Sequence, residues 1–319
     1  MRTTATRLAA FAALALALPL AACGSDDDSS STSAAATAVS VDSTATDGPT
    51  ITIGAQDFGE SAILSEIYGQ ALEANGYSVS QQALGGFRDI VFASFESGDI
   101  NFTAEYAASA LEFLNGFAGE ATSDIDETVA LLQTQLDPKG LVAFTPAPAV
   151  DSNAFVVTAE KAEELGLTNV SDLTADLTLG GPPDCPDNAS CLPGLLSTYD
   201  LDLSANFVPL DGGGPLTVAA LEEGEIDVAI LFSTDGTIAD KGWVVLTDDN
   251  GLINADNITP VASQEVIDAF GVDLQALVDS ISAALTTEEL TELNRRVGIE
   301  LEDADAVAAE WLQSKGFID

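Results

Sequence analysis

Apolar and polar residues recur in the same order in two segments whose first residues are 126 positions apart. The first segment, 84–106, reads LGGFRDIVFASFESGDINFTAEY, and the second, 210–232, reads LDGGGPLTVAALEEGEIDVAILF. Each pattern predicts a glycine turn, an amphipathic helix and a short strand. Gly98 and Gly224 follow the last apolar helical turn, where glycine commonly ends a helix. The sequence thus predicts two copies of one helix–strand unit.

Each unit ends in an aromatic ring, Tyr106 or Phe232, at the end of its predicted strand. Open α/β sheets bind ligands at the carboxyl ends of parallel strands. The two rings are therefore expected at matching sheet edges that face a shared ligand site. The alternative is a chance match, because helix–glycine–strand units are common in α/β proteins, with both rings serving as core residues.

The periodicity of apolar residues predicts alternating strands and helices in the rest of the chain. Strands are expected at 50–55, 77–79, 141–144, 155–158, 207–210 and 243–246. Helices are expected at 61–74, 108–114, 125–136, 160–166, 192–199, 264–270, 274–285, 288–297 and 305–315. Extended segments at 145–151, which contains two prolines, and at 258–262 are expected to cross between two lobes.

The part of the chain that carries these patterns, about 270 residues, exceeds a usual single domain and suits two lobes around one cleft. We predict an α/β fold in which residues 50–152 and 258–319 form lobe I and residues 153–257 form lobe II. The chain then passes between the lobes twice. Two such crossings make a hinge, the device of clamshell binding proteins.

The N-terminal 22 residues have the pattern of an export signal, with two arginines ahead of an apolar run too short to span a membrane. The run ends in the sequence LAAC, which resembles a bacterial lipobox, and that resemblance implies lipidation of Cys23. The alternative is an ordinary signal peptide with a stray cysteine. Residues 23–49 are rich in Ser, Thr, Ala and Asp and are expected to form a flexible tether. We predict a protein that is lipid-anchored to the outer face of the cell membrane.

Nine Lys and Arg residues oppose 52 Asp and Glu residues, so the formal net charge is −43 at pH 7. This charge argues against binding to nucleic acids or anionic lipid surfaces and mildly favours cationic ligands through long-range steering. A solubilising or salt-adapted surface is an alternative source of the charge. The chain has no histidine, which excludes histidine-based triads and histidine-ligated metals. We predict no cofactor and no metal site.

Cys185 and Cys191 lie close together in the proline-rich loop GGPPDCPDNASCLPG. Outside the cytoplasm such a pair is expected to form a disulfide, and two thiols without a histidine make a poor zinc site. A ring this small stabilises a fold by only about 2–3 kcal/mol in the chain-entropy model. The disulfide is therefore expected to shape a loop.

Several segments, in this order, carry a resemblance to a known family: TITIGAQDFGESAILSEIYGQALEAN from residue 50, then GDINFTAEYAASAL, PAPAVDSNAFVV, LFSTDG and DNITPV. They resemble the glycine betaine/choline/carnitine-binding lipoproteins of ABC importers, which belong to the periplasmic-binding-protein type II class. The resemblance implies a two-lobed clamshell that captures a small quaternary-amine osmolyte, cationic or zwitterionic, and hands it to an ABC permease. We expect a monomer without catalytic residues.

The resemblance implies a cleft in which aromatic rings surround the quaternary ammonium group. Such a group has no N–H to donate, and the face of an aromatic ring attracts it by about 0.5–2 kcal/mol per contact. Tyr106 matches a cage tyrosine of the family, Phe232 occupies a second cage position, and Phe58 lies in a loop that lines the cleft. Ser109 matches a family hydroxyl, and Asp151 matches an aspartate near the mouth. The predicted ligand-binding residues are Gln56, Phe58, Tyr106, Ser109, Asp151, Asn153, Phe232, Thr234 and Asp256.

The chain departs from the family pattern at several of these positions. Asn153 and Asp256 stand where relatives often carry cage tyrosines. Gln56 replaces a lysine, and Asn188 replaces an arginine that would hold a ligand carboxylate. Because a buried carboxylate without a paired cation is unfavourable, these changes favour a cation such as choline over betaine, unless Arg88 or backbone amides substitute. A neutral, hydrogen-bonding ligand remains an alternative.

Two other functions remain open from the sequence. The first is a sensor or scaffold lipoprotein of the same fold that has lost its ligand, because the cage has fewer rings than the family pattern. The second is an extracytoplasmic hydrolase that uses a carboxyl pair such as Glu60 and Glu105. Structural roles are expected for Asp235, in a turn, and for Tyr199 and Trp311, in the core.

Overall fold

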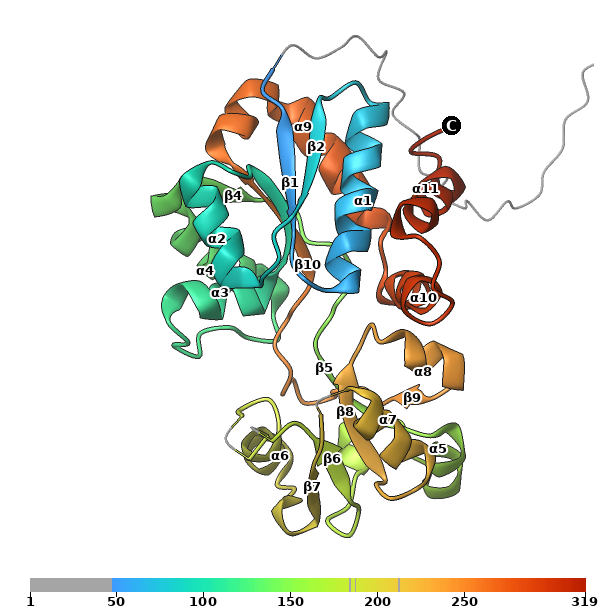
Figure 1. Ribbon diagram of the computed structural model, residues 1–319. Coiled ribbons are helices and arrows are strands. Elements are labelled where there is room, and N and C mark those ends of the chain that lie inside the picture. The colour runs from blue at the N-terminus through green and yellow to red at the C-terminus, as the bar shows by residue number, and fades with distance from the viewer. Residues whose placement is uncertain (1–47, 184, 187, 212) are drawn as a thin grey trace, which may run out of the picture. The chain divides into compact units, whose positions relative to one another are not determined.

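The computed structural model describes residues 48–183, 185–186, 188–211 and 213–319 (Figure 1). The predicted signal peptide, Cys23 and nearly all of the predicted tether lie outside these residues. No helix in the described part of the chain is long and apolar enough to cross a membrane. The fold of this part is mixed α/β and contains two five-stranded sheets.

The first sheet has the strand order β2-β1-β3-β10-β4. Its strands are β1 (Ile51–Ala55), β2 (Val79–Ala83), β3 (Phe102–Tyr106), β4 (Leu141–Ala143) and β10 (Ile258–Ser263). Strand β1 runs parallel to β2 and β3, whereas β10 runs antiparallel to β3 and β4. Strand β3, which ends at Tyr106, is therefore the central strand, where the parallel half of the sheet meets the antiparallel half.

The second sheet repeats this arrangement with the order β7-β6-β8-β5-β9. Its strands are β5 (Asn153–Val157), β6 (Leu179–Gly181), β7 (Phe207–Pro209), β8 (Val228–Phe232) and β9 (Val244–Val245). Strand β6 runs parallel to β7 and β8, and β5 runs antiparallel to β8 and β9. Strands β3 and β8, the strands of the two predicted helix–strand units, thus hold the same central place in their sheets.

Side-chain contacts repeat between the sheets at the same spacing of 126 residues. The side-chain oxygen of Asn101 accepts a hydrogen bond from the backbone N–H of Thr52 at 2.7 Å. In the second sheet, the carboxylate of Asp227 accepts one from the backbone N–H of Thr178 at 2.9 Å. In each unit, the polar residue after the isoleucine therefore links the start of the unit's strand to the start of the neighbouring parallel strand.

Two glycines have equivalent places in the sheets. A Cβ added to Gly54 would lie 2.7 Å from Cδ1 of Ile100, and one added to Gly180 would lie 2.4 Å from Cδ1 of Ile226. In both units the isoleucine side chain fills the space above a glycine of the neighbouring strand. Shared topology and shared contacts together argue against a chance match between the two units.

Helices pack around both sheets (Figure 1). Beside the first sheet lie α1 (Gly59–Ala74), α2 (Arg88–Ser97), α3 (Ala107–Asn115), α4 (Ile125–Leu136), α9 (Gln264–Ala284), α10 (Thr287–Gly298) and α11 (Ala304–Lys315). Beside the second lie α5 (Ala159–Leu165), α6 (Leu192–Tyr199), α7 (Pro215–Glu222) and α8 (Gly236–Lys241). The predicted apolar face of α1, including Ile63, Leu64 and Ile67, is fully buried against this first sheet and α9–α11.

Two antiparallel segments connect the sheets. Val150 and Asn257 form an isolated bridge, and the backbone N–H of Asp151 donates to the carbonyl of Asp256 at 3.1 Å. The chain thus passes from the first sheet to the second at Val150 and Asp151, which is the end of the segment 145–151 predicted for this crossing. The return crossing predicted at 258–262 is wrong, because those apolar, buried residues form β10 and pair with β3 and β4. The return crossing instead precedes β10.

Other helices and strands differ from the predicted ones for local reasons. The strand predicted at 77–79 starts only at Val79, because the N–H of Tyr77 closes the end of α1 by donating to the carbonyl of Leu72. The periodicity does not predict β6, in which two of the three residues are glycine, or the six-residue helix α8. The helices predicted at 264–270 and 274–285 form α9, which is kinked at Gly271 with φ 62° and ψ −141°.

The predicted disulfide between Cys185 and Cys191 is present. Both cysteines are buried in the core of the second sheet. Trp311 lies in the core of the first sheet, as predicted. Tyr199 is only partly buried: its ring packs against the second core, and its hydroxyl donates to Asp248.

Candidate functional site

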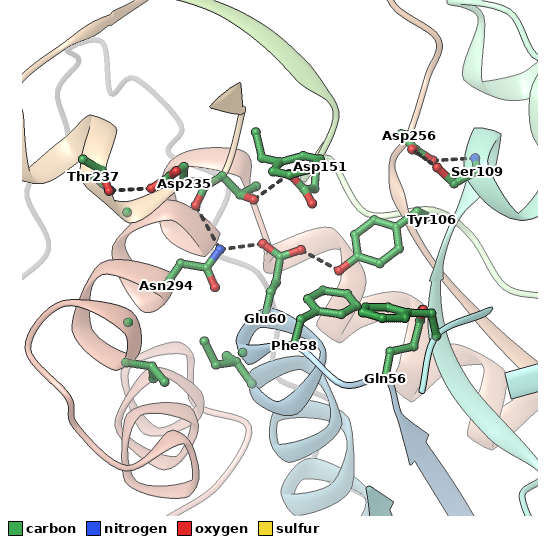
Figure 2. A pocket seen from close by; sticks show the side chains of 18 of the residues that line it. Gln56, Phe58, Glu60, Tyr106, Ser109, Asp151, Asp235, Thr237, Asp256 and Asn294 are labelled. Atoms are coloured by element: carbon green, nitrogen blue, oxygen red, sulfur yellow. Dashed lines mark hydrogen bonds between the residues drawn. The ribbon is translucent and has the colours of Figure 1, made fainter. Parts of the chain in front are cut away.

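A cavity of about 670 Å³ lies among the loops that follow strands of both sheets. Gln56 follows β1, Tyr106 ends β3 and Phe232 ends β8, and all three line the cavity. The rings of both helix–strand units therefore open onto one space. Because open α/β sheets place ligand sites at such strand ends, this cavity is the candidate functional site (Figure 2).

Most of the predicted ligand-binding residues line this cavity: Gln56, Phe58, Tyr106, Ser109, Asp151, Phe232, Thr234 and Asp256. Asn153 does not, because it begins β5 opposite Phe232 and lines an adjoining pocket of about 260 Å³. Asn188 lines the same smaller pocket. That any of these side chains contacts a ligand stays a prediction.

Four aromatic rings surround the cavity among the described residues. Tyr106 is 4% exposed, and its ring centroid lies 6.1 Å from that of Phe58 at an interplanar angle of 37°. Phe232 is 49% exposed and Phe87 is 60% exposed, so both leave ring surface uncovered. Sequence reasoning missed Phe87, although it sits in the glycine turn of the first unit, directly before α2. The aromatic lining is thus larger than the sequence predicts.

Glu60, in the first turn of α1, lies at the centre of a hydrogen-bond network in the cavity (Figure 2). Its Oε1 accepts from the hydroxyl of Tyr106 at 2.6 Å, and its Oε2 accepts from Nδ2 of Asn294 at 2.5 Å. Asn294 Nδ2 also donates to the carbonyl of Thr234 at 2.9 Å. Burial raises the pKa of Glu60, while these donors lower it. The network joins α1 and β3 of the first sheet, through α10, to the loop after β8.

Two further carboxyl groups line the cavity. Asp151 Oδ1 accepts from the hydroxyl of Thr234 at 2.7 Å, and Asp256 accepts from the backbone N–H and hydroxyl of Ser109 at 2.9 and 2.5 Å. Burial and the nearby carboxyl of Glu60 raise the pKa of Asp151 to about 8. Burial also raises the pKa of Asp256, although its bonds to Ser109 oppose the change. Both groups sit in an environment that disfavours their charge.

Arg88 is the basic residue that lines the cavity in the described part of the chain. Its Nε donates to Oε2 of Glu105 at 2.9 Å, and Glu105 is fully buried. Nε2 of Gln56 also donates to this carboxyl, to Oε1 at 3.5 Å. Glu105 itself does not line the cavity, so a hydrolytic pair of Glu60 and Glu105 is not supported.

The cavity therefore has a surplus of carboxyl groups. Among the described residues, Glu60, Asp151, Asp235 and Asp256 line it, against one guanidinium that is already paired with Glu105. Asp235 has the predicted turn role as well, because its carboxylate caps α8 by accepting from the N–H of Thr237 at 2.8 Å. No group of three or more His, Cys, Asp or Glu residues suited to a metal ion occurs among the described residues. The lining suits an organic cation.

Two like α/β lobes with a cavity at their strand ends define a ligand-binding protein of the periplasmic-binding-protein type II class. The OpuAC family model, which describes the substrate-binding domain of ABC-type glycine betaine transport systems, matches residues 49–314. The chain belongs to this family. It is accordingly a substrate-binding protein of an ABC importer, a class that works outside the cytoplasm and delivers its solute to a permease.

Relatives with known names cover nearly all of the described chain. A glycine betaine-binding protein of Escherichia coli (strain K12), YehZ, is 27% identical over 84% of this chain and 91% of its own length. A glycine-betaine-binding protein of Pseudomonas aeruginosa is 28% identical over 85% of this chain and 89% of its own. The crystal structure of a glycine betaine/carnitine/choline ABC transporter protein superposes with a TM-score of 0.75 at 25% identity, covering 84% of this chain and all of that one.

Proposed function

We propose that the cavity captures a small quaternary-ammonium solute and that it prefers a cation of the choline type to glycine betaine. The observation that carries this proposal is the composition of the cavity wall. Aromatic rings and several carboxyl groups line it, and its one guanidinium is paired with Glu105. Relatives that are named for glycine betaine and carnitine support the general class of solute.

The wall of the cavity stabilises a bound trimethylammonium group in two ways. The faces of Tyr106, Phe58 and the exposed rings of Phe87 and Phe232 offer cation–π contacts of about 0.5–2 kcal/mol each. The carboxyl groups add attraction that needs no N–H donor from the ligand. A cation that lacks a carboxylate therefore gains from every charged group in the cavity except Arg88.

Glycine betaine carries a carboxylate that this site supports poorly. The positions where the family resemblance places a lysine and an arginine hold Gln56 and Asn188. Arg88 already satisfies the buried charge of Glu105, and drawing it toward a ligand would weaken that pair. A buried carboxylate without a full partner is unfavourable, and here it also faces other carboxyl groups.

We expect choline to bind about tenfold more tightly than glycine betaine, a difference of about 1.4 kcal/mol. Isothermal titration calorimetry of the mature protein with both ligands at one pH and ionic strength measures it directly. A thermal-shift series with carnitine as a third ligand extends the comparison, because a ligand that binds only the folded state must raise the melting temperature. Equal or tighter binding of betaine would show that Arg88 or backbone amides replace the missing basic residues.

We further propose that Cys23 is lipidated and holds a monomeric protein at the outer face of the cell membrane. The LAAC sequence at residues 20–23 supports this placement. In a bacterial host, labelled fatty acid is expected to enter the wild-type chain and to be absent from Cys23→Ser. Labelled fatty acid in Cys23→Ser, or none in the wild type, would contradict the proposal.

A further inference from the structure

A chain of hydrogen bonds joins the carboxyl groups of Glu60 and Asp151 across the cavity (Figure 2). Asn294 Nδ2 donates to Glu60 Oε2 at 2.5 Å and to the carbonyl of Thr234 at 2.9 Å. The hydroxyl of Thr234 in turn donates to Asp151 Oδ1 at 2.7 Å. Each of these four residues lines the cavity. The two acids therefore lie in the wall of one cavity and are linked through Asn294 and Thr234.

The two acids are not equally stabilised as carboxylates. Both oxygens of Glu60 accept hydrogen bonds, from Tyr106 and Asn294, which favours its ionised form. Asp151 accepts from Thr234 through one oxygen and lies near Glu60 and Asp256, whose negative charges oppose its ionisation. Burial is the main cause that raises the pKa of Asp151, to about 8, and the carboxyls of Glu60 and Asp256 add to it. Asp151 thus has one side-chain donor and Glu60 has two, so hydrogen bonding favours the shared proton on Asp151.

The remaining charged and titratable groups around the pair do not reverse this order. They are Arg88 from α2, Glu105 and Tyr106 from β3, Glu112 from α3, Asp256 from the return crossing, Asp235 at the start of α8, and the Glu292–Arg295 ion pair of α10. The guanidinium among the cavity-lining residues is bound to Glu105, and the other lining groups are acids or a phenol. A positive charge that faces Asp151 must come from the ligand.

We propose that the cavity exchanges a proton for its cationic ligand: when empty, the Glu60–Asp151 pair holds one proton, and the ligand's fixed positive charge displaces it to the solvent. This inference rests on the proposed function and makes it more specific. No covalent bond of the ligand changes, and the only atom that leaves the site is the proton of Asp151. The exchange favours permanent cations, whose charge cannot be lost, and penalises neutral solutes.

The sign of the pH effect follows from this exchange. A cation binds better to the ionised pair, so binding lowers the proton affinity of Asp151 and releases a proton. Choline affinity is then expected to rise by about tenfold per pH unit between pH 6 and the vicinity of 8, and to level off above it. Close to one proton should leave per choline bound near pH 7.

Calorimetry in two buffers tests the proton count. Choline chloride is titrated into the mature protein at pH 7.0 in phosphate and in MOPS, which have different ionisation enthalpies, and at pH 6.0 and 8.5 for affinity. For the wild type, the binding enthalpies in the two buffers are expected to differ by nearly the full difference between the buffers' ionisation enthalpies, because close to one proton is released. Asp151→Asn, which cannot ionise, is expected to show little buffer dependence and a flat affinity profile. Asp126→Asn, the same substitution at an exposed site on α4, serves as the matched control and should behave like the wild type.

A second variant separates titration from a loss of structure. Thr234→Val keeps the shape of a side chain that is 2% exposed but removes the donor to Asp151. Because that donor favours the ionised acid, its loss is expected to move the rise in choline affinity to higher pH. A purely structural role for Thr234 would weaken binding equally at every pH.

The unliganded protein gives a readout that needs no ligand. In the folded state Asp151 keeps its proton to about pH 8, whereas an unfolded aspartate releases it near its ordinary value of about 3.9. The folded state thus binds more protons in this window, and its stability should fall as pH rises from 5 to 8.5. The melting temperature of Asp151→Asn is expected to lack this part of the decline, while Asp126→Asn retains it.

The outcomes distinguish the two proposals. Choline binding with equal enthalpy in both buffers and a flat affinity profile would overturn the proton exchange and leave the proposed function standing. If no quaternary ammonium binds, the proposed function fails, and the melting curves still decide whether Asp151 holds a proton. If the melting temperatures of the wild type and Asp151→Asn change in parallel with pH, Asp151 holds no proton and the proton exchange is wrong as well.

Discussion

Alanine in place of Tyr106 is expected to weaken choline binding about 100-fold, which corresponds to about 2.7 kcal/mol. The substitution removes an aromatic face worth up to about 2 kcal/mol to a desolvated cation. It also removes the hydroxyl that donates to Glu60 Oε1 at 2.6 Å, and so deprives a buried carboxyl of one of its donors. Calorimetry with choline measures the loss, and the melting temperature of the unliganded variant establishes that it is folded.

The ring and the hydroxyl of Tyr106 can be separated with phenylalanine. Tyr106→Phe keeps the aromatic face and its contact with Phe58 but leaves Oε1 of Glu60 without this donor. We expect its choline affinity to stay within about tenfold of the wild type, because a hydrogen bond to a charged group contributes about 1.5–3 kcal/mol in stability and part of that is recovered by solvent in an open cavity. Wild-type affinity in the alanine variant would contradict a cage built on this ring.

The sequence predicted the parts of the fold that are specified locally. The helix–strand units could be predicted because Gly98 and Gly224 adopt positive φ angles of 78° and 71° at the ends of their helices. Strand β6 could not, since Leu179–Gly181 has two glycines among three residues and is held by its pairing with β7 and β8. The return crossing failed for a related reason, because only the partner strands decide whether an apolar segment joins a sheet.

The candidate site likewise contains residues that could be predicted from the sequence and residues that could not. Tyr106 and Phe232 could be placed from sequence because the end of a strand is a local feature and parallel strand ends meet at one edge. Asn294 could not, because its contact with Glu60 joins positions 234 residues apart. Glu60 offered a weak signal, an acid in the first helical turn after a strand-end loop, but helix N-termini commonly carry acids for their own stability. Its role depends on the donors that tertiary packing brings to it.

Gly236, in the wall of the cavity, lies against the backbone of Arg295. Gly236 begins α8, and a Cβ added there would lie 2.5 Å from both N and Cα of Arg295 in α10. Backbone atoms of a helix cannot rotate away as the end of a side chain can. Gly236→Ala must therefore separate α8 from α10, and we expect it to lower the free energy of unfolding by about 3 kcal/mol, the upper part of the range for overpacking. Urea unfolding of the unliganded protein measures this change.

Gly59→Ala is the matched control, because Gly59 also begins a helix and also lines the cavity. An added Cβ at Gly59 meets no atom within 4 Å, so alanine should leave stability unchanged or raise it by up to about 1 kcal/mol. Separation of α8 and α10 would also lengthen the bond from Asn294 to the carbonyl of Thr234. Gly236→Ala is therefore expected to weaken choline binding as well as folding, whereas Gly59→Ala should change neither by much. Equal unfolding midpoints for the two variants would mean that α8 can shift on α10 without loss, and that this contact does not help to shape the cavity.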